Sequence, residues 1–545
     1  MTGSQHVTTK RRRLAIIGGG SSGLICLKYA LDLLPDWDIV CFEKSDNITG
    51  CWGNPYPGFV STSTKYTTQF SCFPKFDASV QPDHGESRSE FFCDGQYGAY
   101  LEEFAEAFKL LRHIALQTHM TALRRGKANV GWELSISCTA SEQKETTTER
   151  FDHVIVCTGL SAEPKPIESD VDCLTVADLN RPEGLGHVTG KRIVVIGGGE
   201  SAVDYANRLA KQELGNEVFL ALKSGIRVSP RYHPIRGVPS DFLRNRLMLS
   251  IHEDLRNRIG QRFVEARILY QEIFERLFPK SHRGLDAVET PADVREQCRQ
   301  WTYKLTKTAK DDLFNMFHNK SDDFLDAVAQ GRITIVGAPV DDCCQTFCEF
   351  DGQQIVDIQP DLIVPAIGYR ARLDEISAGD IQLPDFYLGC CHVTHPDLYL
   401  VGFARPIIGN IPTISEIQAK YVCGLIAGKY VRPAQIAELH QTDLARRKSR
   451  YKKLKMDAVF PVEMFPYCDH LAKLMGDYPT LHAAGRMRAW VRMQLTPATT
   501  MHYFCGDPDM QRRFKSTPVY MPSVLILFLL ALKPLDFLYR VLNVR

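Results

Sequence analysis

The sequence has almost no excess of either charge. Its 545 residues contain 65 Lys and Arg against 64 Asp and Glu, which leaves a formal net charge of +1. A nucleic-acid-binding chain carries a basic footprint, so this balance argues against that class. The 17 cysteines include no Cys-x-x-Cys spacing, which excludes a zinc ribbon and a thioredoxin-type redox pair. They are also too dilute for a disulfide-stapled fold, and we expect reduced thiols.

Long apolar runs are missing as well. Val524–Leu532 is apolar throughout, but it is less than half of the ~20 residues that a membrane-spanning helix needs. Near the N-terminus, the apolar stretch Leu14–Ile17 runs directly into glycines, so no signal-peptide core exists and we expect a cytosol-facing start. With 44% hydrophobic and 24% charged residues, the composition is that of an ordinary globular protein. The length of 545 residues suggests roughly three to five domain-sized units.

The first motif is a glycine-rich turn between a predicted strand and a predicted helix. Leu14–Ile17 predicts the strand, and Gly18, Gly20 and Gly23 follow it in the pattern G-x-G-x-x-G. These glycines form the turn, let the backbone approach a pyrophosphate, and let the helix pack on the strand. Glu43 ends the next predicted strand, where a carboxylate binds both ribose hydroxyls of an unphosphorylated adenosine. This order indicates a dinucleotide site rather than the glycine turn of another α/β protein.

A second unit of the same kind begins at the predicted strand 192–196. Gly197 and Gly199 keep the first two glycines of the motif, and Ala202 replaces the third, which the motif tolerates. A helical segment and the predicted strand 217–222 complete the unit. The chain therefore contains two dinucleotide-binding units.

The second unit ends its second strand with cations where the first has an acid. Lys223 stands at the strand end, and Arg227 and Arg231 lie just beyond it. A cation there pairs with a 2′-phosphate, so we predict NADPH at this unit and FAD at the first. The alternative for Lys223 is a solvated surface lysine. Two units of opposite ribose recognition indicate a flavoprotein reductase or oxygenase, and the missing cysteine pair excludes the disulfide reductases.

We therefore predict an α/β fold with two Rossmann-like dinucleotide-binding domains, a helical insertion and a C-terminal apolar tail. The strand-rich segment from about 335 to 430 is expected to complete the first sheet. The predicted divisions are 1–165 and 335–450 for the two parts of the FAD-binding domain, 166–334 for the NADPH-binding domain with its helical insertion at about 235–325, 451–522 for a C-terminal region, and 523–545 for the tail.

Several ordered landmarks give the chain a resemblance to a known family. They are Phe42–Ser45 with Gly50-x-Trp52, the segments 151–159 and 366–369, and the long segment 402–418. In this order they resemble the flavin-containing monooxygenases, which are FAD- and NADPH-dependent class B flavoprotein monooxygenases of the N,N-dimethylaniline monooxygenase type. The resemblance covers nearly the whole chain.

The resemblance implies a mechanism carried mainly by the cofactors. NADPH reduces FAD, and O₂ adds to the reduced flavin to give a C4a-hydroperoxyflavin. Its distal oxygen then passes to a small-molecule soft nucleophile, an amine nitrogen or a sulfide sulfur. Protein groups mainly orient the reactants and exclude water. We therefore expect neither a Ser-His-Asp array nor a metal site.

The motif positions and the resemblance together name candidate site residues. Thr62 and Ser63 are the catalytic candidates, and the helix that begins near Pro412 should point its positive end at the flavin. For Gln418, one turn into that helix, the alternative to flavin contact is a core-facing glutamine. The FAD candidates are Gly18, Gly20, Ser22, Gly23, Glu43, Cys51, Trp52, Thr158, Gly159 and Gln418, and the NADPH candidates are Gly197, Gly199, Ser201, Ala202, Lys223 and Arg227.

The sequence departs from the family pattern at two places. The usual Phe-x-Gly-x-x-x-His and Ser-x-x-Tyr fingerprint is missing from 170–179, where Thr175 and Leu179 take the histidine and tyrosine positions. Thr62 stands where many members have an asparagine, and a hydroxyl offers one donor where the amide offers two. We expect normal cofactor binding and a leakier oxygenating intermediate.

Two other functions stay open at this point. Trp52, Tyr56, Pro57 and Gly58 resemble the W-x-x-x-Y-P-G of Baeyer–Villiger monooxygenases, which oxygenate ketones. The residue four after Gly58 is not an acid, so this is the second choice. A catalytically silent, membrane-bound flavoprotein acting as a binding module is the alternative from another class. NADPH-dependent flavin reduction separates it from both enzymes.

The last two dozen residues predict attachment to a membrane surface. Val524–Leu532 suits a short dip into acyl chains, and Lys533-Pro534 should interrupt any continuous helix. Beyond it, Asp536, Arg540 and Asn543 form one polar stripe, as expected for a helix in the headgroup plane. For a eukaryotic chain the resemblance implies the cytosolic face of the endoplasmic reticulum, and otherwise the cytoplasm. The alternative is a tail that packs on the protein's own surface or closes a homo-oligomer.

Overall fold

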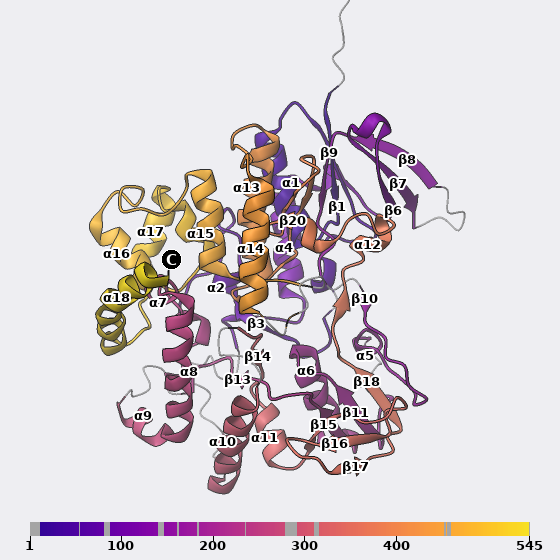
Figure 1. Cartoon of the computed structure of the whole chain (residues 1–545), viewed down its shortest axis with the longest axis vertical. Coiled ribbons are helices and arrows are strands. Elements are labelled where there is room, and N and C mark those ends of the chain that lie inside the picture. Colours follow the sequence, from indigo (N-terminus) through magenta and orange to yellow (C-terminus); the bar gives the residue numbers. More distant parts are fainter. Residues whose placement is uncertain are drawn as a thin grey trace, which may run out of the picture.

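The structure is a computed structural model (Figure 1). It describes residues 11–53, 55–80, 88–139, 146–160, 163–181, 185–234, 236–277, 291–309, 315–451, 454 and 459–543, with the side chains of 374, 375 and 543 left aside.

The first sheet has seven strands and contains the N-terminal glycine motif. Its inner strands are parallel because each follows a crossover, and buried aliphatic residues fill both faces. Helices α1 (Ser21–Leu33) and α13 (Ile411–Ile426) pack against each other beside it. The strand order is β20 (Phe386–Tyr387), β21 (Cys391–His392), β22 (Leu398–Leu400), β9 (His153–Val156), β1 (Arg13–Ile17), β2 (Asp38–Phe42) and β5 (Ile114–Ala115).

The second sheet has six strands and contains the second glycine motif. It lies at the opposite end of the molecule from the first sheet (Figure 1), with helices α6 (Glu200–Leu209) and α11 (Phe324–Ala329) in its core. The strand order is β17 (Ile355–Asp357), β16 (Thr346–Glu349), β15 (Ile333–Pro339), β12 (Glu217–Ala221), β11 (Arg192–Ile196) and β18 (Leu362–Pro365).

This sheet corrects the predicted boundary at 334/335. Strand β15 pairs in parallel with β12, and β18 pairs in parallel with β11, so the segment from 333 to 365 belongs to the NADPH-binding unit. The first sheet resumes only at Phe386. The insertion separates β12 from β15 by more than a hundred residues. A strand joins the sheet whose edge strand is unpaired in the folded molecule. The alternation of residues in the sequence does not show which sheet that is.

Smaller elements connect the two sheets and cover them. They include β3 (Val60–Thr64), which pairs with β4 (Phe91–Cys93) and lies between the two sheets in Figure 1. The others are α2 (Lys65–Thr68), α4 (Gln96–Ala107), β6 (Thr118–Arg125), β7 (Trp132–Cys138), β8 (Thr146–Phe151), β10 (Glu163–Pro164), α5 (Val176–Leu179), β13 (Val228–Ser229), β14 (Asn319–Lys320), β19 (Tyr369–Arg370), α12 (Leu373–Ile376), β23 (Ala404–Ile408) and β24 (Phe460–Glu463).

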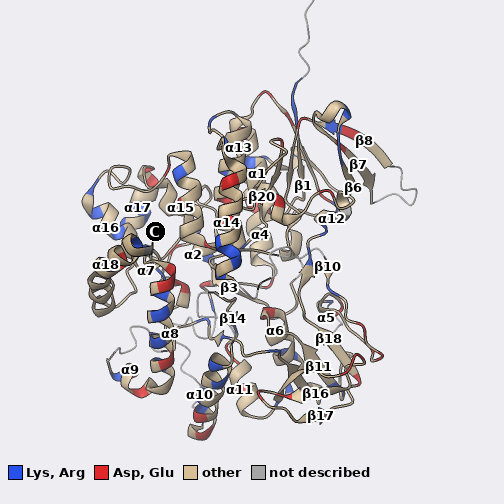
Figure 2. Cartoon of the chain, viewed as in Figure 1, with Lys and Arg blue, Asp and Glu red and all other residues tan. Residues whose placement is uncertain are grey.

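The predicted helical insertion and C-terminal region form the rest of the molecule. Helices α8 and α10 carry many residues of both charges, whereas α18 carries few charges (Figure 2). The helices are α7 (Arg246–Leu249), α8 (Glu253–Leu269), α9 (Gln271–Leu277) and α10 (Ala292–Lys307) in the insertion, and α14 (Ile436–Arg450), α15 (Met464–Met475), α16 (Met487–Leu495), α17 (Pro508–Ser516) and α18 (Ser523–Asn543) after the first sheet.

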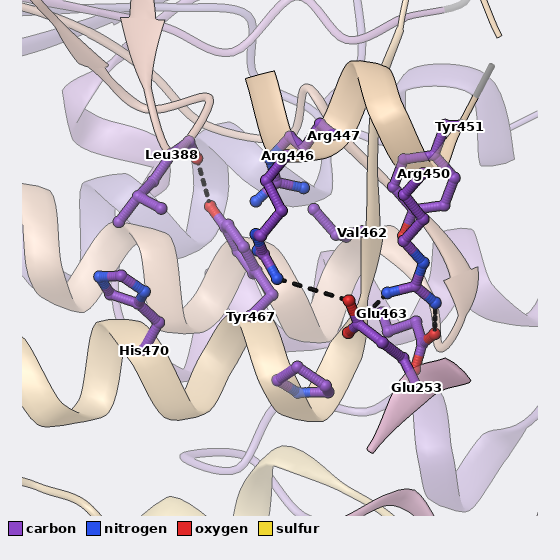
Figure 3. Close-up of a pocket in the computed structure, with 11 residues that line it drawn as sticks. Glu253, Leu388, Arg446, Arg447, Arg450, Tyr451, Val462, Glu463, Tyr467 and His470 are labelled. Atoms are coloured by element: carbon purple, nitrogen blue, oxygen red, sulfur yellow. Dashed lines mark hydrogen bonds and ion pairs between the residues drawn. The ribbon is translucent and has the colours of Figure 1, made fainter. Parts of the chain in front are cut away.

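A buried ion-pair network joins the insertion to the C-terminal region. Glu463, at the end of β24, accepts hydrogen bonds from Arg256 of α8 and Arg450 of α14. Arg450 also lies 2.7 Å from Glu253, and Glu253, Arg450 and Glu463 line a cavity of about 40 Å³ (Figure 3). Tyr467 closes another side of the cavity by donating to the Leu388 carbonyl at 2.7 Å. The network fixes α8 against α14.

Helix α18 corrects two expectations for the tail. It runs without a break through Pro534. The proline removes only one backbone hydrogen bond of the helix, and tertiary contacts hold the turns on either side of it. The polar stripe also faces the protein: Asp536 is buried and accepts from the His252 amide at 2.7 Å, and Arg540 donates to the Ser250 carbonyl at 2.8 Å. Within the described residues, no helix has the length and apolarity to cross a bilayer.

Candidate cofactor and oxygenation site

The first glycine loop has the geometry of a pyrophosphate cradle. Gly18 adopts φ +100°, and a Cβ there would lie 2.9 Å from the Cys157 carbonyl oxygen. A Cβ on Gly23 would lie 1.8 Å from the Gly18 carbonyl oxygen, so only glycine lets α1 approach the loop this closely. Gly20 is the N-cap of α1, whose first turn contains no acid. The positive end of α1 is therefore available to an anion.

Glu43 lies where the sequence predicts a ribose-binding acid. It is buried at the end of β2, where Oε2 accepts from the Gly19 amide at 2.6 Å and Oε1 from the Ser45 amide at 2.9 Å. A carboxylate has about four acceptor sites, so two remain for ribose hydroxyls. The loop and this acid fit the adenosine half of FAD.

The other FAD candidates of the first unit surround the same loop. A short 3₁₀ turn, Gly50–Trp52, brings exposed Cys51 and half-buried Trp52 beside Gly20, whose added Cβ would lie 3.5 Å from the Gly50 Cα. Thr158 and Gly159 follow β9 next to Gly18. Ser22 differs from them because its hydroxyl is buried 2.9 Å from that of Ser415 on α13.

Gln418 lies in the core and not at a flavin surface. Its Oε1 accepts from the Gly402 amide at 3.0 Å and its Nε2 donates to the Tyr467 hydroxyl at 2.7 Å, with the side chain fully buried. The predicted flavin contact is therefore corrected to the alternative, a core-facing glutamine. A helix glutamine has the same sequence signature in both roles, so the pattern had no means to separate them.

The second glycine loop is similar but accepts an alanine. Gly197 adopts φ +139°, and its added Cβ would lie 2.3 Å from the Ala366 carbonyl oxygen but 3.5 Å from the Cβ of buried Ala202. A Cβ on exposed Gly199 would meet nothing within 4 Å, which leaves open space for a phosphate at the start of α6. Ser201 follows in the first turn of α6. This loop fits a second dinucleotide.

The cations after β12 divide between solvent and interior. Lys223 is exposed at the strand end, as a partner for a 2′-phosphate requires. Arg227 is buried and donates to Gln261 of α8, so the prediction that it binds the same phosphate is wrong for this arrangement. After residue 223 the chain passes under helix α8 of the insertion, where Arg227 meets Gln261. The sequence did not predict how the insertion packs on this segment.

Strand β3, which carries Thr62 and Ser63, is held by the NADPH-binding unit. Arg231 donates to the carbonyl oxygens of Val60 at 2.7 Å and Ser61 at 3.0 Å. At the other end of the strand, the Thr64 amide donates to Asp241 at 3.1 Å. The sequence indicated Arg231 only as a cation near the 2′-phosphate, and Asp241 belongs to no motif, so this clamp was not predicted.

The clamp connects the second glycine loop to β3. Lys320 donates to Asp241 at 2.8 Å, and its neighbour Asn319 donates to the Gly198 carbonyl at 3.0 Å. Burial opposes ionisation of Asp241, yet Lys320 holds the pKa of its carboxyl below the usual value. The hydroxyls of Thr62 and Ser63 have no hydrogen-bond partner among the described residues. Both hydroxyls are therefore available to a cofactor or substrate.

The Tyr-Pro-Gly segment forms another contact between the two units. Tyr56 donates to Asp204 of α6, and the guanidinium of Arg208 lies 3.7 Å from the centre of its ring. Burial, and then the Asp204 charge, raise the pKa of Tyr56 well above its usual value, so the phenol keeps its proton and remains a donor. The motif therefore has a structural role between the two units.

Two predicted flavin-facing features meet at one cavity of about 30 Å³. Ser63 of β3 lines it, together with Gly409 and Asn410 at the start of α13. Asn410 caps that helix by accepting from the Thr413 amide at 3.2 Å, and it also donates to the Thr67 carbonyl at 2.7 Å. The start of α13 and one of the two catalytic candidates, Ser63, thus line the same cavity, whereas Thr62 is not part of its wall.

The two loops and this cavity define a flavoprotein with a second, nicotinamide-binding unit. Residues 11–291, just over half of the chain, match the flavin-binding monooxygenase-like family, and the chain belongs to that family. It is an FAD- and NADPH-dependent flavoprotein monooxygenase.

Known proteins resemble the chain over most of its length. It is 26% identical to flavin-containing monooxygenase 5 of Homo sapiens, over 91% of this chain and 89% of that protein. It is 26% identical to dimethylaniline monooxygenase (N-oxide-forming) 2 of Rattus norvegicus, over 86% of this chain and 83% of that protein. The fold resembles NADP⁺-bound cyclohexanone monooxygenase from Rhodococcus sp. Phi1, with a TM-score of 0.53, 18% identity, and coverage of 86% and 98%.

Proposed function

We propose that the protein oxygenates a soft nucleophile, an amine nitrogen or a sulfide sulfur, at the cavity beside Ser63. Bound FAD would take a hydride from NADPH and deliver one atom of O₂ to the substrate, while the other leaves as water. The observation that carries the proposal is the convergence of β3 and the start of α13 on one cavity between the two units. A relative named as an N-oxide-forming enzyme supports amine chemistry over ketone chemistry.

The chain's own residues would bind and position the reactants. The first glycine loop and Glu43 would hold the FAD pyrophosphate and ribose, and Lys223 the 2′-phosphate of NADPH. The unpartnered hydroxyls of Thr62 and Ser63 would hydrogen-bond the nicotinamide ribose or the reacting oxygen. Arg231 and Asp241 hold their strand in place.

A two-stage experiment tests the reaction class. The purified yellow protein is reduced anaerobically with NADPH, then mixed with oxygen and a panel of amines, sulfides and ketones. We expect flavin bleaching by NADPH and N-oxide or sulfoxide products that gain one oxygen atom. An ester or lactone from a ketone would favour the Baeyer–Villiger alternative. No flavin reduction would leave only the silent binding module.

Replacing Lys223 with alanine should raise the KM for NADPH. Loss of a charge-assisted bond to the 2′-phosphate costs about 1.5–3 kcal/mol, which corresponds to roughly one to two decades in affinity. NADH lacks that phosphate, so its KM should not change. Steady-state kinetics with both nucleotides measures the difference, and the exposed Lys211 gives a matched control in Lys211→Ala. Equal use of NADH and NADPH by the wild type would contradict the role of Lys223.

We infer further that α18 attaches the protein to a membrane surface, at the cytosolic face of the endoplasmic reticulum if the chain is eukaryotic. Asp536 and Arg540 of its polar stripe bind His252 and Ser250, and Leu529 is buried against the protein. Other apolar side chains of α18 lie outward: Val524, Leu527, Phe537 and Leu542 are 65%, 66%, 66% and 73% exposed. Such a row of apolar residues is unusual on a water-facing helix and suits the acyl-chain boundary.

A chain truncated after Pro522 tests the attachment. We expect the full-length protein to sediment with phosphatidylcholine vesicles and the truncated protein to stay in the supernatant, folded and loaded with flavin. The measurement is the flavin absorbance in pellet and supernatant. A full-length protein that stays soluble without detergent contradicts the membrane proposal. A full-length dimer that becomes a monomer on truncation would instead support the homo-oligomer alternative.

A further inference from the structure

The cavity beside Ser63 contains a charged group that neither the sequence motifs nor the cofactors explain. Arg244 lines it, together with Asp241, Leu249 and Met464. Arg244 follows a short 3₁₀ turn, Ser240–Leu243, and its backbone is fixed on both sides. Its amide donates to the Asp241 carbonyl at 3.1 Å, and its own carbonyl accepts from the Ala498 amide at 2.8 Å. The position of this arginine in the cavity wall is therefore well defined.

Arg244 shares its acidic neighbour, Asp241, with a second cation, Lys320. Asp241 is already paired: Oδ1 accepts from Lys320 at 2.8 Å and Oδ2 from the Thr64 amide at 3.1 Å. The Arg244 guanidinium forms an ion pair with Asp241 at 3.6 Å but is too far from it for a hydrogen bond. Among the described residues, this guanidinium has no hydrogen-bond partner. Asp241, Lys320 and Arg244 together carry one net positive charge, and the guanidinium donors of Arg244 remain available at the cavity wall.

We propose that Arg244 recognises a carboxylate on the substrate, so that the substrate class is a compact sulfide or amine that also carries a carboxylate. This inference rests on the proposed function of the cavity. A guanidinium binds a carboxylate through two parallel hydrogen bonds, which gives both affinity and orientation. Leu249 and Met464 supply the apolar wall for the rest of the molecule.

The geometry also accounts for the orientation of the substrate. The cavity of about 30 Å³ has room for a carboxylate-sized group, and the Arg244 side chain is 25% exposed, so the ligand can reach it from solvent. With the carboxylate held by Arg244, the remainder of the substrate would extend out of this small cavity, past the side that Ser63 lines. A lysine in place of Arg244 would keep the charge but lose the two-pronged geometry.

Matched substrates and variants test the proposal. Sulfoxide formation from 3-(methylthio)propionate is compared with that from its neutral primary amide, in wild type, Arg244→Gln and Arg244→Lys. We expect wild type to prefer the acid in kcat/KM, and Arg244→Gln to reduce the acid-to-amide ratio roughly 10- to 100-fold through KM. Arg244→Lys should recover part of the ratio. Arg486→Gln, at an exposed position, should keep the wild-type ratio.

Calorimetric titration of the oxidised holoenzyme with the same two compounds separates this inference from the proposed function. Tighter binding of the acid than of the amide, with the acid's Kd raised by Arg244→Gln, supports the carboxylate site whether or not either compound is oxygenated. Binding of this kind without any oxygenation would overturn only the proposed reaction. Equal affinities for acid and amide in wild type, or an unchanged Kd for the acid in Arg244→Gln, would overturn the carboxylate site.

Discussion

A Gly23→Ala variant should be purified as a colourless protein without FAD. The added Cβ would lie 1.8 Å from the Gly18 carbonyl oxygen, and both atoms belong to backbone segments that cannot rotate away. The loop must open, which separates the Gly18 turn from α1 and displaces the cradle for the pyrophosphate. An overpacking cost of about 3 kcal/mol reduces FAD affinity about 100-fold. The ratio of flavin absorbance to protein absorbance measures the loss.

The second unit provides the control for this prediction. Ala202 occupies the corresponding position there and is fully buried without a clash. Ala202→Gly should therefore leave flavin loading unchanged, and Ala202 shows that a Cβ is tolerated wherever the loop lies further away. Full FAD loading of Gly23→Ala, with unchanged circular dichroism, would show that the first loop does not bind the pyrophosphate.

Local constraints explain how much of the site could be predicted from the sequence. Gly18 and Gly23 are needed because of contacts within a few residues or with one neighbouring strand end, so the motif records them. Glu43 and Lys223 end strands that follow each glycine motif at a fixed spacing, and both lie where that spacing places them. Short-range geometry of this kind leaves a signature in the chain.

Long-range packing explains what could not be predicted. Strands β15 and β18 join the second sheet because its edges are free, although the pattern of each strand fits either sheet. Arg227 is buried by α8, and the polar stripe of α18 is bound by the turn at Ser250. Arg231, Asp241 and Arg244 belong to no motif, and their roles follow only from the strand and cavity that they contact.

Breaking the buried network at Glu463 should destabilise the C-terminal region. In the Glu463→Ala variant, the Arg256 guanidinium loses its bond to Glu463, and Arg450 keeps Glu253 and the Asn315 side chain. The side chains of Glu463 and Arg256 are 2% and 5% exposed, so water cannot replace the lost bonds. Removing one partner of a buried ion pair costs about 3–5 kcal/mol. Urea denaturation followed by circular dichroism measures the decrease in the unfolding midpoint.

The exposed pair between Glu296 and Arg299 of α10 provides the control. Glu296→Ala removes a carboxylate that water solvates equally well, so it should leave the urea midpoint almost unchanged.

The loss at Glu463 should also reach the cavity beside Ser63, since Met464 follows Glu463 directly in the chain and forms part of the wall of that cavity. We therefore expect Glu463→Ala to weaken binding of 3-(methylthio)propionate as well. A variant with the wild-type urea midpoint would show that α8 and α14 are held together by other contacts.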